Sequence, residues 1–472
     1  MSTYKLAVIV KNPLIDDEFL LLKQTPPPKF GDDEYDSYVD SDLWDLPWAQ
    51  LHILEGESQS RIVVDGQYLC SEKLDLSRLD IHLALNKVLA EVGLERHSGM
   101  GVHWKFWKYV EEPEFGPGSP VHTVYITGTL GTEDGKLQAM CKWMSIQSCL
   151  NWLLDVKPSS DRVGPLAVIG LLTDSILSPK WRIPPTLHFQ LKDIVAALPR
   201  KLVVFVTHHH RDHVDGLSIV QNSNPDAILL AHENTMRRIQ KDDWSLGYTS
   251  VSGDEEICIG DQRLRVIFAP GHTDGHVALL HVNTHSLIVG DHCVGQGSAI
   301  LDITSGGNMT EYFQTTYKFM ELSPHALIPM HGRVNLWPKH MLCGYLKNRR
   351  GRESSILKAI ENGAKTLFDI VAHTYSDVDR SFWIPAASNV RLHVDHLAQE
   401  KKLPKEFSIQ KFQMTCGLHF LSQWLWAYLS AGFIFKDQKV RTAILLAALA
   451  VAGFAVLYTV ENKVSLTNER NS

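Results

Sequence analysis

The sequence predicts a multidomain protein that combines α+β and α/β folds with a membrane-anchoring segment. Three observations lead to this fold class. The chain has 472 residues, enough for about three domains of roughly 150 residues each. Polar side chains repeatedly follow apolar, strand-like runs between residues 202 and 331, as in many α/β active sites. A run of nineteen uncharged residues lies near the C-terminus. We expect the following parts: residues 1–160, an α+β domain; 161–345, an α/β domain; 346–405, a helical cap; and 413–463, the anchoring tail.

Composition limits the classes of function. The 46 Lys and Arg residues against 53 Asp and Glu give a net charge of -7, which argues against nucleic-acid binding mainly through overall basicity. Seven cysteines occur without a CxxC pair, whereas there are 23 histidines. This balance favours a reducing compartment, and a metal site built from imidazole and carboxylate groups.

The first 160 residues predict two strands and a helix. Leu6–Val10 and Phe19–Leu22 are apolar runs on either side of a turn-rich segment, and the opening residues do not have the pattern of a secretory signal. Between Asp80 and Gly93, apolar residues recur at helical spacing. A strand, a hairpin, the sequence WDLP and a helix ending in AEVGLE together resemble the Nudix hydrolase fold.

The magnesium-binding motif of that family is degenerate in this chain. Asn86, Lys87 and Ala90 stand where the Nudix motif has Arg, Glu and Glu, and only Glu91 matches. A hard cation needs several oxygen ligands, and Lys87 would repel it. We therefore expect a Nudix-like scaffold without Nudix catalysis, with Glu91 as a solvated charge.

The strongest chemical signal lies in LVVFVTHHHRDHVDG, residues 202–216. Five apolar residues predict a buried strand, and His208, His210, Asp212 and His213 follow its end. A cluster of four ligand-type side chains is hard to explain by packing, because burying polar groups without partners is costly. The intervening side chains of this segment are expected to face solvent or neighbouring groups.

Three later segments repeat the arrangement of a strand followed by a ligand-type residue. His272 follows a strand ending at Phe268, Asp291 follows Leu287–Val289, and His331 follows Leu327–Met330. Imidazole and carboxylate ligands together suit zinc.

The order HxHxDH, PGHTxGH, GD and PxHG resembles the metallo-β-lactamase superfamily over residues 191–345. The resemblance implies an αββα core and two zinc ions that activate a shared water. It implies the following ligands: His208, His210 and His272 for one metal; Asp212, His213 and His331 for the other; and Asp291 as a bridge. Asp212 would also have the catalytic role of orienting the water or receiving its proton, and His276 and His292 would fix the ligand-bearing loops.

One departure from that family concerns the start of the core. The helix-like run 191–201 is preceded by a proline-interrupted segment instead of the family's opening strands. A block of strands is therefore expected to be missing between Gln190 and Leu191, and the central sheet should have unpaired edges.

Residues 346–405 predict three short helices of a winged-helix type cap. The motif RxxRE-xx-IL after the core resembles the β-lactamase-like protein 2 group, in a plant-type arrangement with an N-terminal Nudix-like domain. The characterised animal member of that group is a mitochondrial endoribonuclease. Under this resemblance four basic residues would contact RNA phosphates, although a solvated helix face is the alternative. They are Lys347, Arg349, Arg350 and Arg352.

The uncharged run Thr442–Val460 is long enough to span a bilayer core. Lys436, Lys439 and Arg441 precede it, so we expect a single-pass tail anchor with the catalytic part facing the cytosol. Residues 415–435, rich in Trp and Tyr, would form an interfacial belt or a second span. The alternative for the uncharged run is a buried globular helix.

The sequence thus predicts a membrane-tethered, zinc-dependent hydrolase, and the resemblance favours RNA as its substrate. A glyoxalase II-like thioester hydrolase, acting on a small molecule, would use the same ligands. A non-catalytic, membrane-anchored isoform with an incomplete core is the third alternative. The natural substrate, the particular membrane and the oligomeric state are left open.

Overall fold

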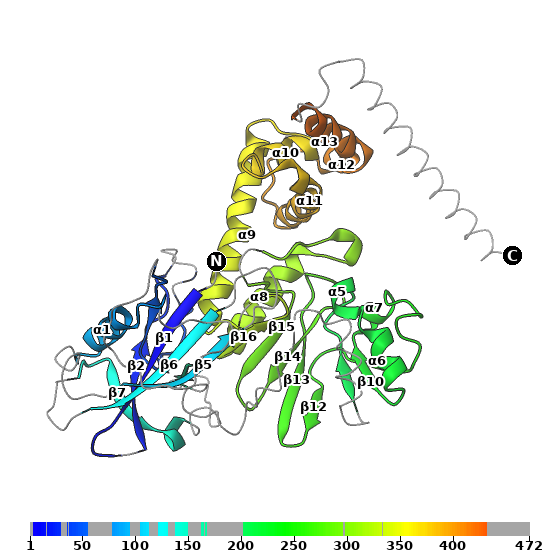
Figure 1. The fold of residues 1–472 in the computed structure, drawn as a ribbon. Helices are drawn as coiled ribbons and strands as arrows, with labels where there is room; N and C mark the ends of the chain where they lie inside the picture. The colour runs from blue at the N-terminus through cyan, green and yellow to red at the C-terminus, as the bar shows by residue number, and fades with distance from the viewer. Residues whose placement is uncertain are drawn as a thin grey trace. The chain divides into compact units, whose positions relative to one another are not determined.

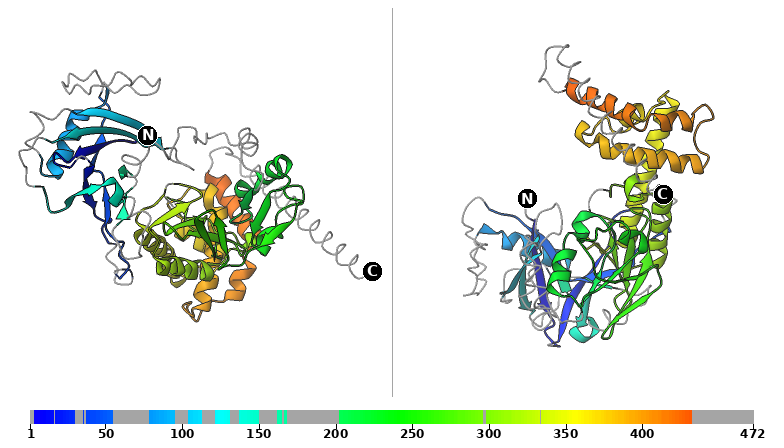
Figure 2. Two further views of the ribbon diagram at one scale, coloured as in Figure 1. Left: turned by 90° about the horizontal axis from the view of Figure 1, so that it is seen from below. Right: turned by 90° about the vertical axis from the view of Figure 1, so that its right-hand side faces the viewer.

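The computed structural model divides into two compact units, one comprising most of residues 1–344 and the other mainly the helices that follow. Figures 1 and 2 show three β-sheets and the C-terminal helices. The described residues are 3–15, 17–29, 35, 37–54, 78–94, 104–112, 121–130, 137–149, 162–164, 166–167, 202–295, 298–332 and 334–431.

The N-terminal sheet is mixed and has eight strands. Its central strand β1 pairs antiparallel with β2 and β4 and parallel with β6. The strands are β1 (Thr3–Lys11), β2 (Glu18–Gln24), β3 (Leu43–Asp45), β4 (Trp48–Leu51), β5 (Lys105–Glu112), β6 (Val121–Thr129), β7 (Cys141–Ser145) and β8 (Arg162–Val163). The two predicted strands are therefore confirmed as β1 and β2.

The predicted helix is confirmed as α1 (Ile81–Glu91). It begins at Asp80, whose side chain accepts a hydrogen bond from the Leu83 backbone N–H at 3.0 Å. It ends before Gly93, whose φ of 82° favours glycine. Leu85 and Val88 of α1 pack into a core with the β1 side chains on one face of the sheet. This arrangement does not by itself establish a Nudix fold, which stays a prediction.

Two further sheets pack face to face. The first is parallel, in the order β11-β10-β9, and the second has the order β12-β13-β14-β15-β16. Val266, Val277 and Leu279 of the second sheet share a core with Phe205 and Leu230 of the first. The strands are β9 (Val203–Phe205), β10 (Ile228–Ala231), β11 (Tyr248–Ser250), β12 (Glu256–Ile259), β13 (Gln262–Phe268), β14 (Val277–His281), β15 (Ser286–Gly290) and β16 (Ala326–Pro329).

Short helices connect these strands. Val214, Leu217 and Val220 of the first two helices share a core with Leu229 and Ala231 of β10. The helices are α5 (Arg211–Val214), α6 (Leu217–Ser223), α7 (Glu233–Met236) and α8 (Met309–Leu322), with a 3-10 turn at Ile303–Ser305. Helix, sheet and sheet therefore form successive layers, as the resemblance implies.

The prediction that residues 202–206 form a buried strand is wrong in part. β9 pairs with β10 on one side, and no strand of the described residues pairs with its other side. Val203 is consequently 41% exposed, although Val206 is buried. The predicted helix 191–201 and the position proposed for the missing strands lie outside the described residues.

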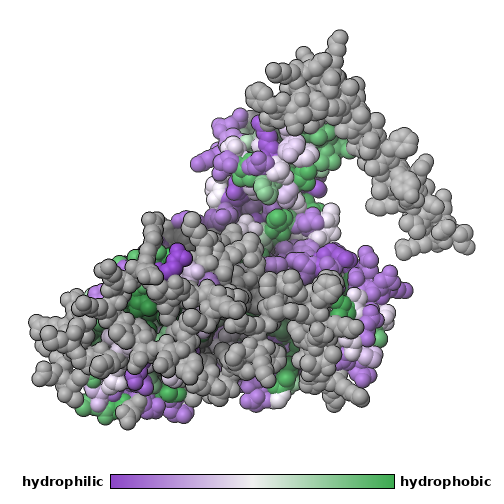
Figure 3. Space-filling model, viewed as in Figure 1, coloured by the Kyte–Doolittle hydropathy of each residue, from purple (hydrophilic) through white to green (hydrophobic). Residues whose placement is uncertain are grey.

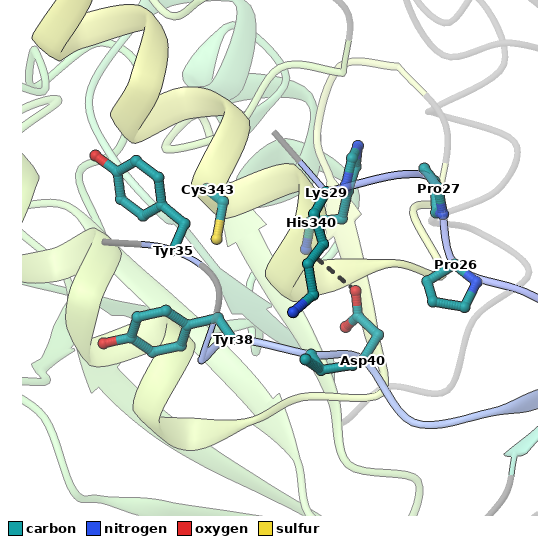
Figure 4. Close-up of a pocket in the computed structure, with 9 residues that line it drawn as sticks. Pro26, Pro27, Lys29, Tyr35, Tyr38, Asp40, His340 and Cys343 are labelled. Carbon is teal, nitrogen blue, oxygen red and sulfur yellow. Dashed lines mark hydrogen bonds between the residues drawn. The ribbon is translucent and has the colours of Figure 1, made fainter. Parts of the chain in front are cut away.

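The C-terminal region is helical, drawn yellow to orange in Figures 1 and 2. It contains α9 (Pro338–Glu361), α10 (Leu367–Thr374), α11 (Trp383–Gln399), α12 (Ile409–Met414) and α13 (Leu418–Ala431), with a 3-10 turn at Arg380–Phe382. The first helix is longer than predicted and begins eight residues before residue 346. It begins earlier because Asp40 accepts hydrogen bonds from the backbone N–H groups of Lys339 (3.0 Å) and His340 (3.1 Å) in its first turn (Figure 4).

Helix α13 contains the aromatic residues of the predicted interfacial belt. Trp424 packs against the core of the helical unit, and its Nε1 donates to the Arg380 carbonyl at 2.7 Å. Leu418 and Leu421 are 44% and 43% exposed, and hydrophobic surface is visible beside α12 and α13 in Figure 3. Among the described helices, none has both the length and the apolar character to cross a bilayer. The predicted span 442–460 lies outside the described residues.

A buried polar network joins α9 to α11. The Glu353 carboxylate is paired with the Nδ1 atoms of His396 (2.6 Å) and His393 (3.4 Å), and all three residues are buried. Burial alone would raise the pKa of Glu353, but hydrogen bonds from the two histidines outweigh it and lower that pKa to about 2. Burial lowers the pKa of His393 to about 4. His393 is therefore neutral at pH 7.

Acidification should destabilise the helical unit. The folded pKa of His393, about 4, lies below the ordinary 6.5, so the unfolded state binds more protons and stability falls as pH drops from 6.5 towards 4. At pH 5 the loss is about 2 kcal/mol by linkage. The contribution of Glu353 is lost only as pH falls from 4.5 through about 2, outside this window.

The measurement is urea unfolding at pH 7 and pH 5, followed by far-ultraviolet circular dichroism. His393→Gln should reduce the pH dependence. His373→Gln, at an exposed histidine of α10, is the matched control and should retain it. Equal pH dependence in the two variants would contradict the assignment.

Candidate metal centre

The segment after β9 turns its side chains towards one point. The chain passes from β9 through buried Thr207 and His208 into helix α5, for which His210 is the N-cap residue with an extended backbone. The Thr207 hydroxyl lies 3.1 Å from His208 Nδ1, so Nε2 is the ring nitrogen directed at the neighbouring ligand-type groups. Thr207 was not singled out by the sequence analysis, although it directly precedes the motif.

The structure brings four of the predicted residues into a first group. The ligand-type atoms of this group all lie within 4.8 Å of one another; it consists of His208, His210, His272 and Asp291. His208 Nε2 lies 3.0 Å from His210 Nδ1 and 3.7 Å from Asp291 Oδ2. His272, from the connection between β13 and β14, is 4% exposed.

A second group meets the same 4.8 Å criterion and consists of Asp212, His213, Asp291 and His331. His213 Nε2 lies 3.3 Å from Asp291 Oδ2 and 3.3 Å from His331 Nε2. His331 Nε2 also lies 3.0 Å from Asp212 Oδ2. The two groups are the same sets that the resemblance implies, with Asp291 shared between them.

Asp291 occupies the centre because of the turn that follows β15. Its side chain is 10% exposed. Gly290 precedes it with a φ of 56°, and a Cβ atom there would lie 2.3 Å from His276 Nε2. Only glycine fits this turn, which makes Gly290 a functional position that sequence reasoning passed over inside the GD motif.

The donor set fits two divalent cations. Ring nitrogens approach other ring nitrogens at 3.0 and 3.3 Å around one carboxylate, and cations at these points would satisfy all of these acceptors together. Each group offers four nitrogen or oxygen donors, the number that a borderline metal such as zinc takes in proteins. The site is therefore suited to a pair of metal ions bridged by Asp291.

His276 and His292 belong to neither group and hold loops in place. His276 Nδ1 lies 3.0 Å from the Ala269 carbonyl, and its Nε2 accepts the Asp291 backbone N–H at 3.2 Å. Burial lowers the pKa of His276 to about 4, so the ring is neutral as these hydrogen bonds require. His292 Nε2 lies 2.8 Å from the Thr316 hydroxyl.

The intervening residues of the first motif belong to neither ligand group. Arg211 has a side chain that is 70% exposed and pairs with Asp215 at 2.7 Å. His209 is half-buried, and its ring lies 5.2 Å from that of His210.

The three arginines among the predicted phosphate contacts are engaged within the protein. Arg349 is 4% exposed and its Nη1 donates to Asn389 Oδ1 at 3.0 Å. Arg350 pairs with Glu353 at 3.6 Å, and Arg352 donates to the Thr374 carbonyl at 2.7 Å. The prediction of a direct phosphate contact is wrong for Arg349, because its guanidinium is buried. Lys347 is exposed.

A hollow of about 420 Å³, open to solvent, lies elsewhere. It is lined by residues 26, 27, 29, 35 and 38–40 and by His340 and Cys343 of α9. Figure 4 shows Tyr35, Tyr38 and His340 on its wall. None of its lining residues belongs to the two ligand groups. It is therefore separate from the candidate metal centre.

Comparison with known families identifies the class of this site. Residues 173–331 match the metallo-beta-lactamase superfamily, and residues 366–407 match the beta-lactamase associated winged helix domain. The chain therefore carries a metallo-β-lactamase superfamily domain followed by a winged-helix domain, as predicted. The matched residues begin at 173, and a Nudix-like N-terminal domain is not supported by them.

The chain is also similar to individual proteins. The chain is 27% identical to the beta-lactamase-like protein 2 homolog of Drosophila melanogaster over 211 residues, which are 42% of this chain and 69% of the relative. It is 30% identical to a hydroxyacylglutathione hydrolase of Gloeobacter violaceus over 156 residues, 32% of this chain and 55% of that one. Among solved structures, a metallo-β-lactamase family protein of Thermus thermophilus has a TM-score of 0.39 and 16% identity, covering 46% of this chain and 82% of that chain.

Removal of the shared carboxylate of Asp291 should abolish the binding of both metal ions. Asp291→Ala should reduce the metal content from about two ions per chain to near zero, since Asp291 belongs to both groups. His331→Ala should lose one ion, because it removes a ligand from the second group alone. Elemental analysis of the dialysed proteins checks this, and an Asp291→Ala protein that keeps two ions would contradict the assignment.

Proposed function

We propose that this protein is a zinc-dependent hydrolase whose substrate is RNA. The observation that carries the proposal is the pair of ligand groups sharing Asp291. Bound zinc ions would supply Lewis acidity, lowering the pKa of water and stabilising negative charge that develops on the substrate. Their identity as zinc rests on the mixture of five imidazole and two carboxylate ligands.

The side chains of this chain have separable tasks in such a reaction. Asp212 is the more exposed carboxylate of the site, with 58% of its side chain accessible, and it lies 3.0 Å from His331 Nε2. It is therefore placed to orient a water and to hold its proton at a carboxylate oxygen. Asp291 is buried beside His208 and His213. Its carboxylate is suited to hold the positively charged metal ions in place instead.

RNA is favoured as the substrate by two considerations. The matched relatives include beta-lactamase-like protein 2 homologues of Drosophila melanogaster and Caenorhabditis elegans. The RxxRE motif, formed here by Arg349, Arg352 and Glu353, resembles the same group, whose characterised animal member is an endoribonuclease. Exposed Lys347 is the remaining predicted phosphate contact.

Thioester hydrolysis is the second candidate, and the hydroxyacylglutathione hydrolase relative favours it. The same seven ligands serve both reactions, so geometry around the metals does not separate them. A non-catalytic isoform with an incomplete core remains the third hypothesis, and residues 168–201, on which it depends, lie outside the described residues.

Substrate tests on the full chain separate these hypotheses. The protein should cleave single-stranded RNA and leave S-lactoylglutathione unchanged, and His210→Ala should abolish cleavage because it removes a ligand of the first group. His281→Ala, at the far end of β14, is the matched histidine control and should retain activity. Consumption of S-lactoylglutathione alone would favour the thioesterase, and full activity of His210→Ala would contradict the ligand assignment.

We also propose that residues 442–460 anchor the chain in a membrane. The uncharged run and the preceding Lys436, Lys439 and Arg441 support this. The full chain should stay with membranes after extraction with alkaline carbonate, because an inserted helix is not released by disrupting electrostatic contacts. Release of the protein into the supernatant would contradict the proposal.

A further inference from the structure

The first turn of α8 packs beneath two arginines of α9. The guanidinium carbon of Arg349 lies 4.9 Å from the ring centre of Tyr312, and that of Arg350 lies 4.5 Å from the ring centre of Phe313. Tyr312 is fully buried, and Phe313 is 4% exposed. A cation and the aromatic ring that it covers attract each other more strongly when both are shielded from water. The two arginines therefore hold the start of α8 against α9.

The start of α8 in turn sets the loop that carries His272. Gly271, the residue before it, has a φ of 126°, and a Cβ atom there would lie 2.4 Å from both the Cα and the backbone N of Tyr312. The Asn308 backbone N–H donates to the Gly271 carbonyl at 2.9 Å. Backbone therefore packs directly on backbone, and a shift of Tyr312 must move the peptide that leads into His272.

Arg349 is itself held rigidly. Its Nη1 donates to Asn389 Oδ1 at 3.0 Å, and the Asn389 amide group donates to the Pro385 carbonyl at 3.1 Å. The Leu301 backbone N–H lies 3.5 Å from the same Asn389 oxygen. A planar, permanently charged guanidinium in such a setting loses little rotamer freedom on binding its partners. Arg349 can therefore transmit the position of α9 and α11 to Tyr312.

We propose that Arg349 is a positioning residue for the metal ligand His272, acting through Tyr312 and Gly271. This inference rests on the proposed metal site. The helical unit then holds His272 in place, the ligand of the first group that comes from the loop after β13. The burial of Arg349 and its contact with the Tyr312 ring assign this role to it.

The test measures metal affinity in the full chain. Protein stripped of metal is titrated with Co²⁺, and the two sites are followed by visible absorption and by competition with a chelator. Arg349→Ala should weaken one of the two sites roughly tenfold, at the lower end of the range for groups that support metal ligands. The other site, formed by Asp212, His213, Asp291 and His331, should keep its affinity.

Three further variants make the result specific. Gly271→Ala should weaken the same site, since it separates the loop from Tyr312 directly, and Arg349→Lys should restore part of the affinity because it keeps a cation over the ring. Lys358→Ala, at an exposed position on the same helix, is the matched control and should bind both ions normally. Circular dichroism checks that each variant is folded. If Arg349→Ala does not fold, the metal affinity of Arg349→Lys is compared with that of the unaltered chain instead.

The outcomes are distinguishable. If the unaltered chain binds no Co²⁺, the proposed metal site fails and this inference fails with it. If the unaltered chain binds two ions and both the Arg349 and Gly271 variants bind them with unchanged affinity, the positioning role alone is overturned. Equal weakening of both sites would also overturn it, because the effect would then be a general loss of structure.

Discussion

The arrangement of this protein's candidate centre depends on the burial of one carboxylate among imidazoles. Asp291 has a side chain that is only 10% exposed, and it lies within 3.7 Å of the Nε2 atoms of His208, His213 and His331. A buried carboxylate is tolerated only where charge and hydrogen bonding compensate for lost hydration. Gly290 and His276 serve this need by shaping the turn and binding the Asp291 backbone.

Buried charged groups also need partners in the C-terminal helices. A winged-helix cap could be an independent substrate-binding module, yet its arginines point inward to α8 and to the network of Glu353, His393 and His396. A buried network of this kind is costly if any member lacks a partner, so its members are interdependent. These arginines and the buried network therefore belong to the interior of the helical unit.

Local sequence patterns predicted the helices and strands that are defined by the spacing of their own apolar residues. Helix α1 follows from apolar spacing and its capping residues, and strands β13, β15 and β16 follow from apolar runs that precede His272, Asp291 and His331. Side-chain contacts depended on the neighbouring elements. Trp424, a residue of the predicted interfacial belt, packs on the core of the helical unit. Arg349 was expected to meet phosphate but meets Tyr312.

By itself, the sequence determined the chemical identity of the candidate centre. The sequence has an excess of histidine over cysteine, and His and Asp recur after its strand-like runs. Both properties can be recognised without knowledge of the fold. Only the tertiary structure decided that the ligand atoms of each group lie within 4.8 Å of one another, that β9 is paired on one side among the described residues, and that Arg349 is buried. The physical reason is that these depend on contacts between segments distant in the chain, which no local spacing encodes.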